Sequence, residues 1–399
     1  LAVPVPTGQS LGVPPLPTAS MTLRGKRWLA LVPGGRPAVP GSDSSREAAA
    51  APGSRRFFAA AAALAQGAAA VAAEPPTVSA PLWQALIHPP VVRAAERGTS
   101  TAGSPASSTQ ASLPPPALAV VADPTGPLLL GPSAELSSAL VTGQLVELTR
   151  AGVAYDVWLL GDCARRSLRG RRAYLFLTPF QLDKRQREDV SFLKDRQHLL
   201  LFSYAAGAIR PGTGINGREI FGLTGVHVTS LRGGKPLRVK ALAGVEPWTA
   251  SLRDDVVYGT RASVSPWFGC LGSGGEVLGY LEGTRLPGLV AGQHDSWSSV
   301  YSAAPGLPAP LLQSLATAAG AETCCRGKVR LAAGSGIVAL WPEEDEAVEV
   351  RFPAGLRVLH LAPEGWTEQP RATSTAGLKL QARRGEPLIF SLQPLPTTR

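Results

Sequence analysis

The chain is 399 residues long, with 44% apolar residues and a formal net charge of +10. That is enough apolar material for one core of about 200 residues and a second, smaller core, so a wholly unfolded chain is excluded. Because the positive charge is spread along the chain and no basic segment is interleaved with aromatic residues, we predict no nucleic-acid partner. No run reaches the roughly 20 strongly apolar residues of a membrane-spanning helix, so we also expect no membrane span.

Residues 1–115 form a lead rich in Ala, Pro, Ser and Gly, with nine Lys or Arg and four Asp or Glu. The lead has no sustained helical or strand period, so we expect it to be disordered. Within it, residues 54–73 resemble a twin-arginine export signal, because Arg55 and Arg56 precede an Ala-rich run that ends in small residues. This leaves two locations open: export to the periplasm or the cell exterior, and the cytoplasm if the run is only Ala-rich low complexity. Whether Leu1 is the true start also stays open.

Strand-like and helix-like segments alternate after the lead. Apolar runs typical of strands buried on both faces lie at Leu118–Ala122, residues 155–160, Ala173–Leu177 and His198–Ser203. Leucines at helical spacing follow the first run, at Leu136, Leu140, Leu145 and Leu148, and a charged helix is predicted from Asp183 to Lys194. Crossover helices between strands imply parallel pairing, so the sequence predicts an α/β fold with a doubly wound parallel sheet.

The end of the chain has a different pattern, in which short strand-like runs are separated by turns. The runs are residues 329–331, 336–341, 348–352, 356–361, 378–380 and 387–392. They predict a small antiparallel β-sandwich. Because Trp341 and Trp366 are isolated rather than part of an aromatic cluster, we favour capping of the core over sugar binding for this module.

No catalytic constellation is evident at the ends of the predicted strands. Ser203 follows a buried strand but lacks the flanking glycines of a nucleophile elbow. We interpret His198 and His227 as structural histidines. Residues 212–217 fit the pattern G-x-G-x-x-G, but eight residues separate them from the preceding strand, and no acid occurs between Glu219 and Glu246 to hold a ribose hydroxyl. We therefore interpret this segment as a glycine-rich loop and predict no cofactor.

The four cysteines, Cys163, Cys270, Cys324 and Cys325, lack the paired spacing of zinc ligands, and no histidine lies at ligand spacing beside them. We therefore predict no metal site and interpret these residues as small buried thiols.

Seven segments, residues 142–148, 152–157, 176–180, 200–207, 220–226, 276–280 and 296–308, occur together in this order. In order and approximate spacing they resemble the amidotransferase-like middle domain of β-galactosidase-type glycoside hydrolases, over about residues 116–322. The resemblance implies a flavodoxin-like sheet, similar to that of class I glutamine amidotransferases but without their nucleophile. It also implies self-association, with a trimer expected.

Residues 323–399 are similar to the C-terminal β domain of the same enzymes, whose catalytic acids lie in a preceding TIM barrel of about 250 residues. The low-complexity lead does not resemble such a barrel. We therefore expect three regions, 1–115, 116–322 and 323–399, and the leading hypothesis is a non-catalytic oligomerisation or accessory region of a β-galactosidase-like glycoside hydrolase. Trp267 and Phe268 are the candidate interface anchor, because aromatic residues are enriched in interface cores.

Two alternatives stay open. One is a hydrolase or amidotransferase-like enzyme that acts at the carboxyl edge of the sheet through Ser203 and a histidine. The other is an accessory protein that binds sugar. Whether the chain is itself an enzyme is therefore open, and the sequence assigns no catalytic residue.

Overall fold

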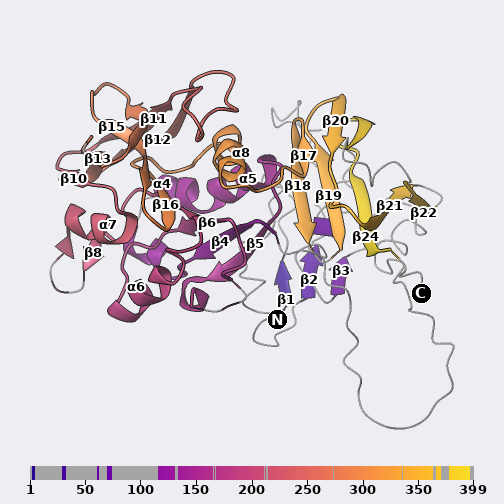
Figure 1. Ribbon diagram of the computed structural model, residues 1–399, viewed down its shortest axis with the longest axis horizontal. Coiled ribbons are helices and arrows are strands. Elements are labelled where there is room, and N and C mark those ends of the chain that lie inside the picture. Colours follow the sequence, from indigo (N-terminus) through magenta and orange to yellow (C-terminus); the bar gives the residue numbers. More distant parts are fainter. Residues whose placement is uncertain are drawn as a thin grey trace, which may run out of the picture. The chain divides into compact units, whose positions relative to one another are not determined.

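The computed structural model describes residues 2–4, 29–32, 61–62, 70–73 and 116–395, apart from residues 131–133, 165, 167, 211, 213, 273, 335, 363–364 and 370–376. These residues divide into two compact units (Figure 1). One unit contains the described residues from 116 to 324. The other contains those from 325 onward together with the described residues of the lead.

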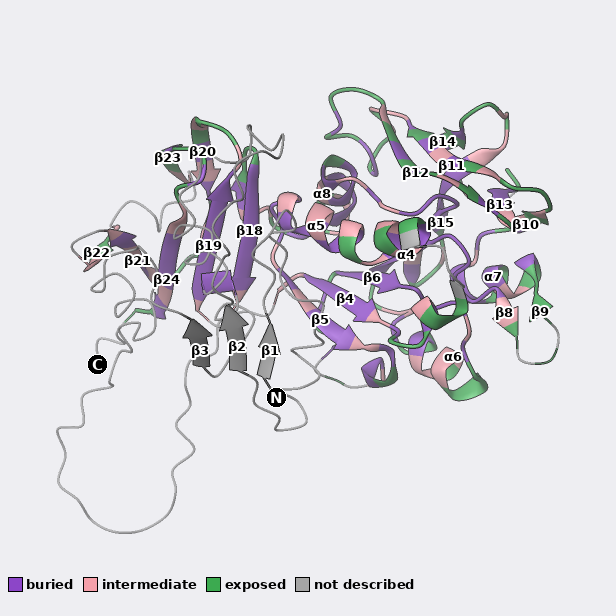
Figure 2. Cartoon of the chain, turned by 180° about the vertical axis from the view of Figure 1, so that it is seen from behind, coloured by how far each residue is buried: buried purple, intermediate pink, exposed green. Residues whose placement is uncertain are grey.

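Five parallel strands form the centre of the 116–324 unit. They are β4 (Leu118–Ala122), β5 (Tyr155–Leu159), β6 (Ala173–Leu177), β7 (His198–Ser203) and β16 (Trp297–Ser302). Across the sheet their order is β5-β4-β6-β7-β16. β6 is buried along its whole length and β4 in all but its last residue (Figure 2). The strands predicted from apolar runs are confirmed, because strands covered on both faces need such runs.

The sheet is mixed, which corrects the prediction of a parallel sheet. Four antiparallel strands extend it beyond β16 to nine strands: β15 (Pro287–Gln293), β14 (Glu276–Leu281), β11 (Lys235–Ala241) and β12 (Val256–Val264). A separate sheet pairs β10 (Val228–Leu231) with β13 (Trp267–Cys270). In β11 and β12, buried residues are interspersed with more exposed ones, so neither strand is apolar along its whole length. In β12, for example, Tyr258, Thr260 and Val264 are buried between more exposed residues.

Helices cover both faces of the parallel strands (Figure 1). On one face, α5 (Thr142–Arg150) contacts both α4 (Ala134–Leu140) and α8 (Ala309–Ala318). On the other, α6 (Lys184–Ser191) contacts the short 3₁₀ helix η2 (Leu160–Asp162). The helix predicted to follow β4 is therefore two helices.

Helix α6 begins after Asp183, as the sequence predicts, but ends at Ser191 rather than at Lys194. The Asp183 carboxylate accepts a hydrogen bond from the backbone N–H of Gln186 at 2.7 Å, and the Gln186 side chain accepts one from the Asp183 N–H at 2.9 Å. This reciprocal capping box satisfies two N–H groups that the first turn leaves without partners inside the helix.

The other unit contains two antiparallel sheets, which confirms the antiparallel pairing predicted for the end of the chain. One sheet has the order β18 (Val329–Gly334), β19 (Ile337–Pro342), β24 (Leu388–Pro394), β21 (Leu356–Ala362) and β22 (Gly365–Glu368). The other contains β17 (Cys325–Arg326), β20 (Glu346–Val350) and β23 (Leu378–Ala382). Phe390 of β24 is fully buried and packs edge-on against Phe352, which follows β20, with ring centroids 5.2 Å apart.

Three short strands of the lead, β1 (Ala2–Pro4), β2 (Leu29–Val32) and β3 (Ala70–Ala73), pair in parallel. The prediction that the lead is disordered is therefore wrong for these three strands. Runs of three or four residues are too short to give a periodic signal in the sequence, yet their backbones can still pair. The twin-arginine pair of the candidate export signal lies outside the described residues. Within the part of the chain that the structure describes, no helix is both long and apolar enough to span a membrane.

Candidate functional site

The parallel strands end at one edge of the sheet, where α/β proteins place their ligands. Thr178 follows β6 and Tyr204 follows β7, and both have positive φ angles, of 53° and 54°. Such angles are uncommon outside glycine, and for a β-branched residue such as threonine they are outliers that the surrounding structure must hold in place. Backbone strain is therefore present at this edge of the sheet, at the ends of β6 and β7.

Tyr204 occupies the turn after β7, next to Ser203 at the end of that strand. Its hydroxyl donates a hydrogen bond to the carbonyl oxygen of Pro266 at 3.0 Å, and its own carbonyl accepts one from the Tyr301 hydroxyl. Its ring packs edge-on against Phe180 and Phe268, with centroid distances of 6.0 and 5.4 Å. Burial raises the pKa of Tyr204 to about 12, so the phenol stays protonated at neutral pH.

Ser203 and His198, the histidine of the same strand, lie at opposite ends of β7. Five residue steps along a strand place them roughly 16 Å apart. His198 is buried, and its Nδ1 lies 3.1 Å from the carbonyl oxygen of Leu193. Burial lowers the pKa of His198, so the ring is neutral and Nδ1 donates that hydrogen bond. The structure does not bring Ser203 and His198 together.

At the neighbouring strand ends, of β4 and β6, polar side chains are also engaged by hydrogen bonds within the chain. Asp123, which follows β4, is buried, and its Oδ1 accepts hydrogen bonds from the N–H and the hydroxyl of Thr125 at 2.9 and 2.7 Å. The Thr178 hydroxyl donates to the Asp123 carbonyl at 3.1 Å. A Cβ at Gly126 would lie 2.0 Å from the carbonyl oxygen of Thr178, so the turn packs directly on the next strand end. The Asp123 carboxylate thus stabilises the turn that follows β4.

The glycine-rich segment forms a hairpin and a helix start instead of a phosphate loop opening directly from a strand. β8 (Ile209–Arg210) pairs with β9 (Gly214–Ile215), and α7 (Gly217–Thr224) begins two residues later. Asn216 caps α7, since its side chain accepts a hydrogen bond from the Arg218 N–H at 2.9 Å. A Cβ at Gly217 would lie 2.6 Å from the carbonyl oxygen of Val228, so this glycine permits α7 to pack closely on β10.

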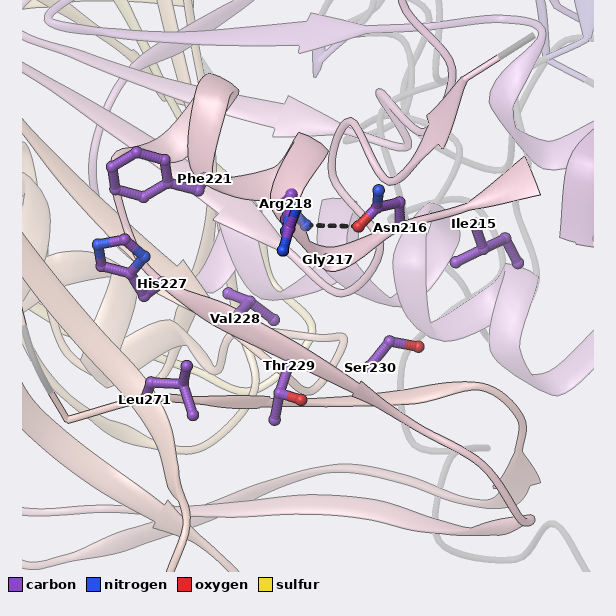
Figure 3. Close-up of a pocket in the computed structure, with 10 residues that line it drawn as sticks. All are labelled: Ile215, Asn216, Gly217, Arg218, Phe221, His227, Val228, Thr229, Ser230 and Leu271. Carbon is purple, nitrogen blue, oxygen red and sulfur yellow. Dashed lines mark hydrogen bonds between the residues drawn. The ribbon is translucent and has the colours of Figure 1, made fainter. Parts of the chain in front are cut away.

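A hollow of about 610 Å³ lies between α7 and β10 (Figure 3). Its ten lining residues are Ile215, Asn216, Gly217, Arg218, Phe221, His227, Val228, Thr229, Ser230 and Leu271. The rings of Phe221 and His227 stack face to face, with centroids 4.0 Å apart and planes at 13°. His227, which the sequence pattern indicates as a structural histidine, is exposed and lines this hollow.

A second hollow, of about 540 Å³, lies between α4 and β12 and includes Glu135, Thr260 and Arg261. Glu135 is the acid in this lining. Its Oε1 already accepts hydrogen bonds from the Thr260 hydroxyl and from the Ala262 N–H, each at 3.0 Å. The carboxylate therefore links α4 to β12 through these two hydrogen bonds.

The two aromatic residues predicted as an interface anchor have different surroundings. Phe268 is fully buried beside Tyr204, so its ring has no surface to offer a partner. Trp267 is half-buried, and the ammonium group of Lys235 lies 4.3 Å from its ring centroid. Of the two, only Trp267 is accessible, and its interface role stays a prediction.

Across the described parts of both units, no group of three or more His, Cys, Asp or Glu side chains is arranged to hold a metal ion. The four cysteines are free thiols, of which Cys163, Cys270 and Cys325 are buried. Burial raises the pKa of the Cys270 thiol to about 12, so it is protonated at neutral pH.

No family model matches this sequence, and no curated protein matches it either. Solved structures with a similar fold include α-L-fucosidase isoenzyme 2 from Paenibacillus thiaminolyticus, with a TM-score of 0.55 and 11% identity over 96% of this chain and 63% of that one. The β-galactosidase from the Antarctic haloarchaeon Halorubrum lacusprofundi gives a TM-score of 0.52 and 13% identity over 93% of this chain and 54% of that one.

The β-galactosidase from Bacillus circulans sp. alkalophilus gives a TM-score of 0.48 and 14% identity over 70% of this chain and 41% of that one. The chain thus spans less than two thirds of the length of each of these three structures. At these identities the likeness concerns the fold alone, and fold does not by itself specify activity.

Proposed function

We propose that this chain is a non-catalytic accessory region of a glycoside-hydrolase-like, carbohydrate-related protein, and that it acts in the assembly of protomers. Support comes from the fold, since a fucosidase and a β-galactosidase, each with a TM-score above 0.5, align with more than nine tenths of this chain. The proposal further takes residues 116–322 as the amidotransferase-like domain and residues 323–399 as a β-sandwich.

The strand order supports the amidotransferase-like assignment. Numbered along the chain among themselves, the five parallel strands run 2-1-3-4-5 across the sheet, which is the flavodoxin-like order. The four antiparallel strands then extend the sheet at one side. In this proposal they are an addition to a flavodoxin-like core.

The observation that carries the non-catalytic role is Tyr204. It sits with a positive φ at the strand end where the related fold presents a nucleophile, yet its hydroxyl is committed to Pro266 and its pKa is raised to about 12. A protonated phenol held by a carbonyl is a poor nucleophile. These contacts therefore favour a role for Tyr204 in packing at this edge, and not in catalysis.

The test is an assay of the purified full chain against aryl β-galactosides and aryl α-L-fucosides. We expect no hydrolysis above background, with a Ser203→Ala variant behaving identically to the wild type. Turnover that disappears when an acid within residues 116–399 is replaced would overturn the proposal. Turnover that depends on Ser203 would favour the alternative of an enzyme acting at the carboxyl edge.

The sugar-binding alternative is favoured by a separate observation, the hollow between α7 and β10. An aromatic pair beside several hydrogen-bonding side chains in a concave surface is typical of small-ligand sites. Binding there would be compatible with an assembly role for the rest of the chain.

A further inference from the structure

The hollow between α7 and β10 presents an unusual concentration of exposed apolar surface. Phe221 is 42% exposed, Ile215 48% and Leu271 46%, and all three line it. In Figure 3 the stacked rings of Phe221 and His227 lie at one end of the hollow and Ile215 at the other. An aromatic platform of this kind suits a ligand with a flat apolar face, such as the C–H face of a sugar ring.

The charge of the hollow is positive. Arg218 is the only residue with a permanent charge among the ten described lining residues, and its guanidinium has no ion-pair partner in the described chain. The nearest acid along the sequence, Glu219, is already bound by Arg187 and Arg210, each at 3.3 Å. The unpaired guanidinium therefore favours a ligand that carries a carboxylate or another planar anion.

Hydrogen-bonding groups complete the lining. Thr229 and Ser230 contribute hydroxyls from β10, and Asn216 contributes an amide whose oxygen is used in capping α7 while its NH₂ group points to no protein acceptor among the described residues. The ten residues include no carboxylate, whereas glycoside hydrolysis requires a pair of them. The hollow is therefore equipped to bind a sugar and not to cleave one.

We propose that this hollow binds an acidic saccharide, with the ring of a uronic acid residue stacked on the Phe221–His227 pair and its carboxylate paired with Arg218. The choice of a sugar over other flat anions rests on the proposed carbohydrate-related function. The choice of an acidic sugar rests on the unpaired Arg218. A volume of about 610 Å³ is within the range of small-ligand sites.

The experiment is calorimetric titration of the full chain with trigalacturonate and trimannuronate, and with their neutral counterparts galactotriose and mannotriose. The test variants are Phe221→Ala and Arg218→Gln. Matched controls are Phe192→Ala, because Phe192 is 46% exposed elsewhere in the same unit, and Arg253→Gln, which removes another exposed arginine. Circular dichroism of each variant verifies that its fold is retained.

We expect at least one acidic trisaccharide to bind more tightly than its neutral counterpart. Arg218→Gln should weaken that binding about tenfold and abolish the preference for acid, because a charge-assisted hydrogen bond is lost. Phe221→Ala should weaken both acidic and neutral binding about fivefold. The two control variants should bind as the wild type does.

The proposal is wrong if neither acidic sugar binds, if neutral sugars bind equally well, or if the two test variants bind like the controls. These outcomes do not bear on the proposed function. Its non-catalytic part is tested by the hydrolysis assays, and its assembly part is tested by sedimentation. Conversely, a monomeric chain that binds an acidic sugar through Arg218 would refute assembly and retain this site.

Discussion

At the scale of single residues, Lys194 is the clearest example of a charge held in an unfavourable place. Its ammonium group lies 4.6 Å from the centroid of the Trp297 ring and donates a hydrogen bond to the carbonyl oxygen of Gly222 at 3.3 Å. Burial, with a smaller contribution from Arg187, lowers the pKa of Lys194 from 10.5 to about 8. The two contacts do not compensate for the loss of hydration of the charge.

This lowered pKa predicts a pH dependence of stability. Between pH 8 and 10.5 the unfolded chain keeps the proton at Lys194 and the folded chain does not, so this residue makes the free energy of unfolding rise with pH in that window. From pH 7.5 to pH 9.5, the change in the free energy of unfolding measured with urea should be more positive in the wild type than in Lys194→Met. Lys184→Met is the control, because Lys184 is 94% exposed. Equal pH dependence in Lys194→Met and the wild type would contradict the lowered pKa.

At the scale of elements, the packing of α7 on β10 depends on a close backbone approach at Gly217. A Cβ there would lie 2.6 Å from the Val228 carbonyl oxygen, whereas a Cβ at Gly222 of the same helix would meet nothing within 4 Å. Gly217→Ala should therefore lower the free energy of unfolding by about 1–3 kcal/mol through overpacking. Gly222→Ala should raise it by about 0.5–1 kcal/mol, because alanine favours helix. Thermal and urea unfolding of the two variants would check this, and a neutral Gly217→Ala would show that α7 can shift away from β10.

The same elements show what the sequence could predict. β6 and β7 are continuous apolar runs, because both their faces are covered, and such runs are visible without a structure. β12 has no such run, because Gly259 interrupts it. This glycine has a φ of 122°, and a Cβ there would lie 2.0 Å from the carbonyl oxygen of Leu237. A glycine is needed at this position because the backbone of β11 passes close to it, and the pattern of neighbouring residues in the sequence does not reveal such a contact.

The candidate sites were harder to predict than the strands. Phe221 and His227 are six residues apart, and they stack because the chain reverses at Gly225, which ends α7 with a φ of 71°. A C-capping glycine is a local signal, but the direction of the following chain depends on β10 and β13. The positive φ of Tyr204 likewise has no signature in its side-chain type, since tyrosine rarely adopts it.

At the scale of the whole molecule, the proposed function requires that the chain self-associate, and Trp267 is the accessible member of the predicted anchor. Phe268→Ala is unsuitable as an interface test, because emptying a fully buried site should cost about 3–5 kcal/mol of stability whether or not a partner is present. Trp267→Ala removes a half-buried ring and should leave the fold intact. Truncating a central aromatic residue of an interface often costs about 2 kcal/mol or more of binding free energy.

We therefore expect the full chain to sediment as an oligomer, with a trimer proposed, at tens of micromolar, and Trp267→Ala to shift it towards monomers with an unchanged circular dichroism spectrum. Tyr280→Ala is the matched control, since Tyr280 of β14 is 42% exposed and belongs to the same unit. A wild-type monomer in this concentration range would refute the assembly role. An oligomer that Trp267→Ala and Tyr280→Ala leave equally intact would retain assembly and place its interface on another surface, because a central anchor cannot be removed without a loss of affinity.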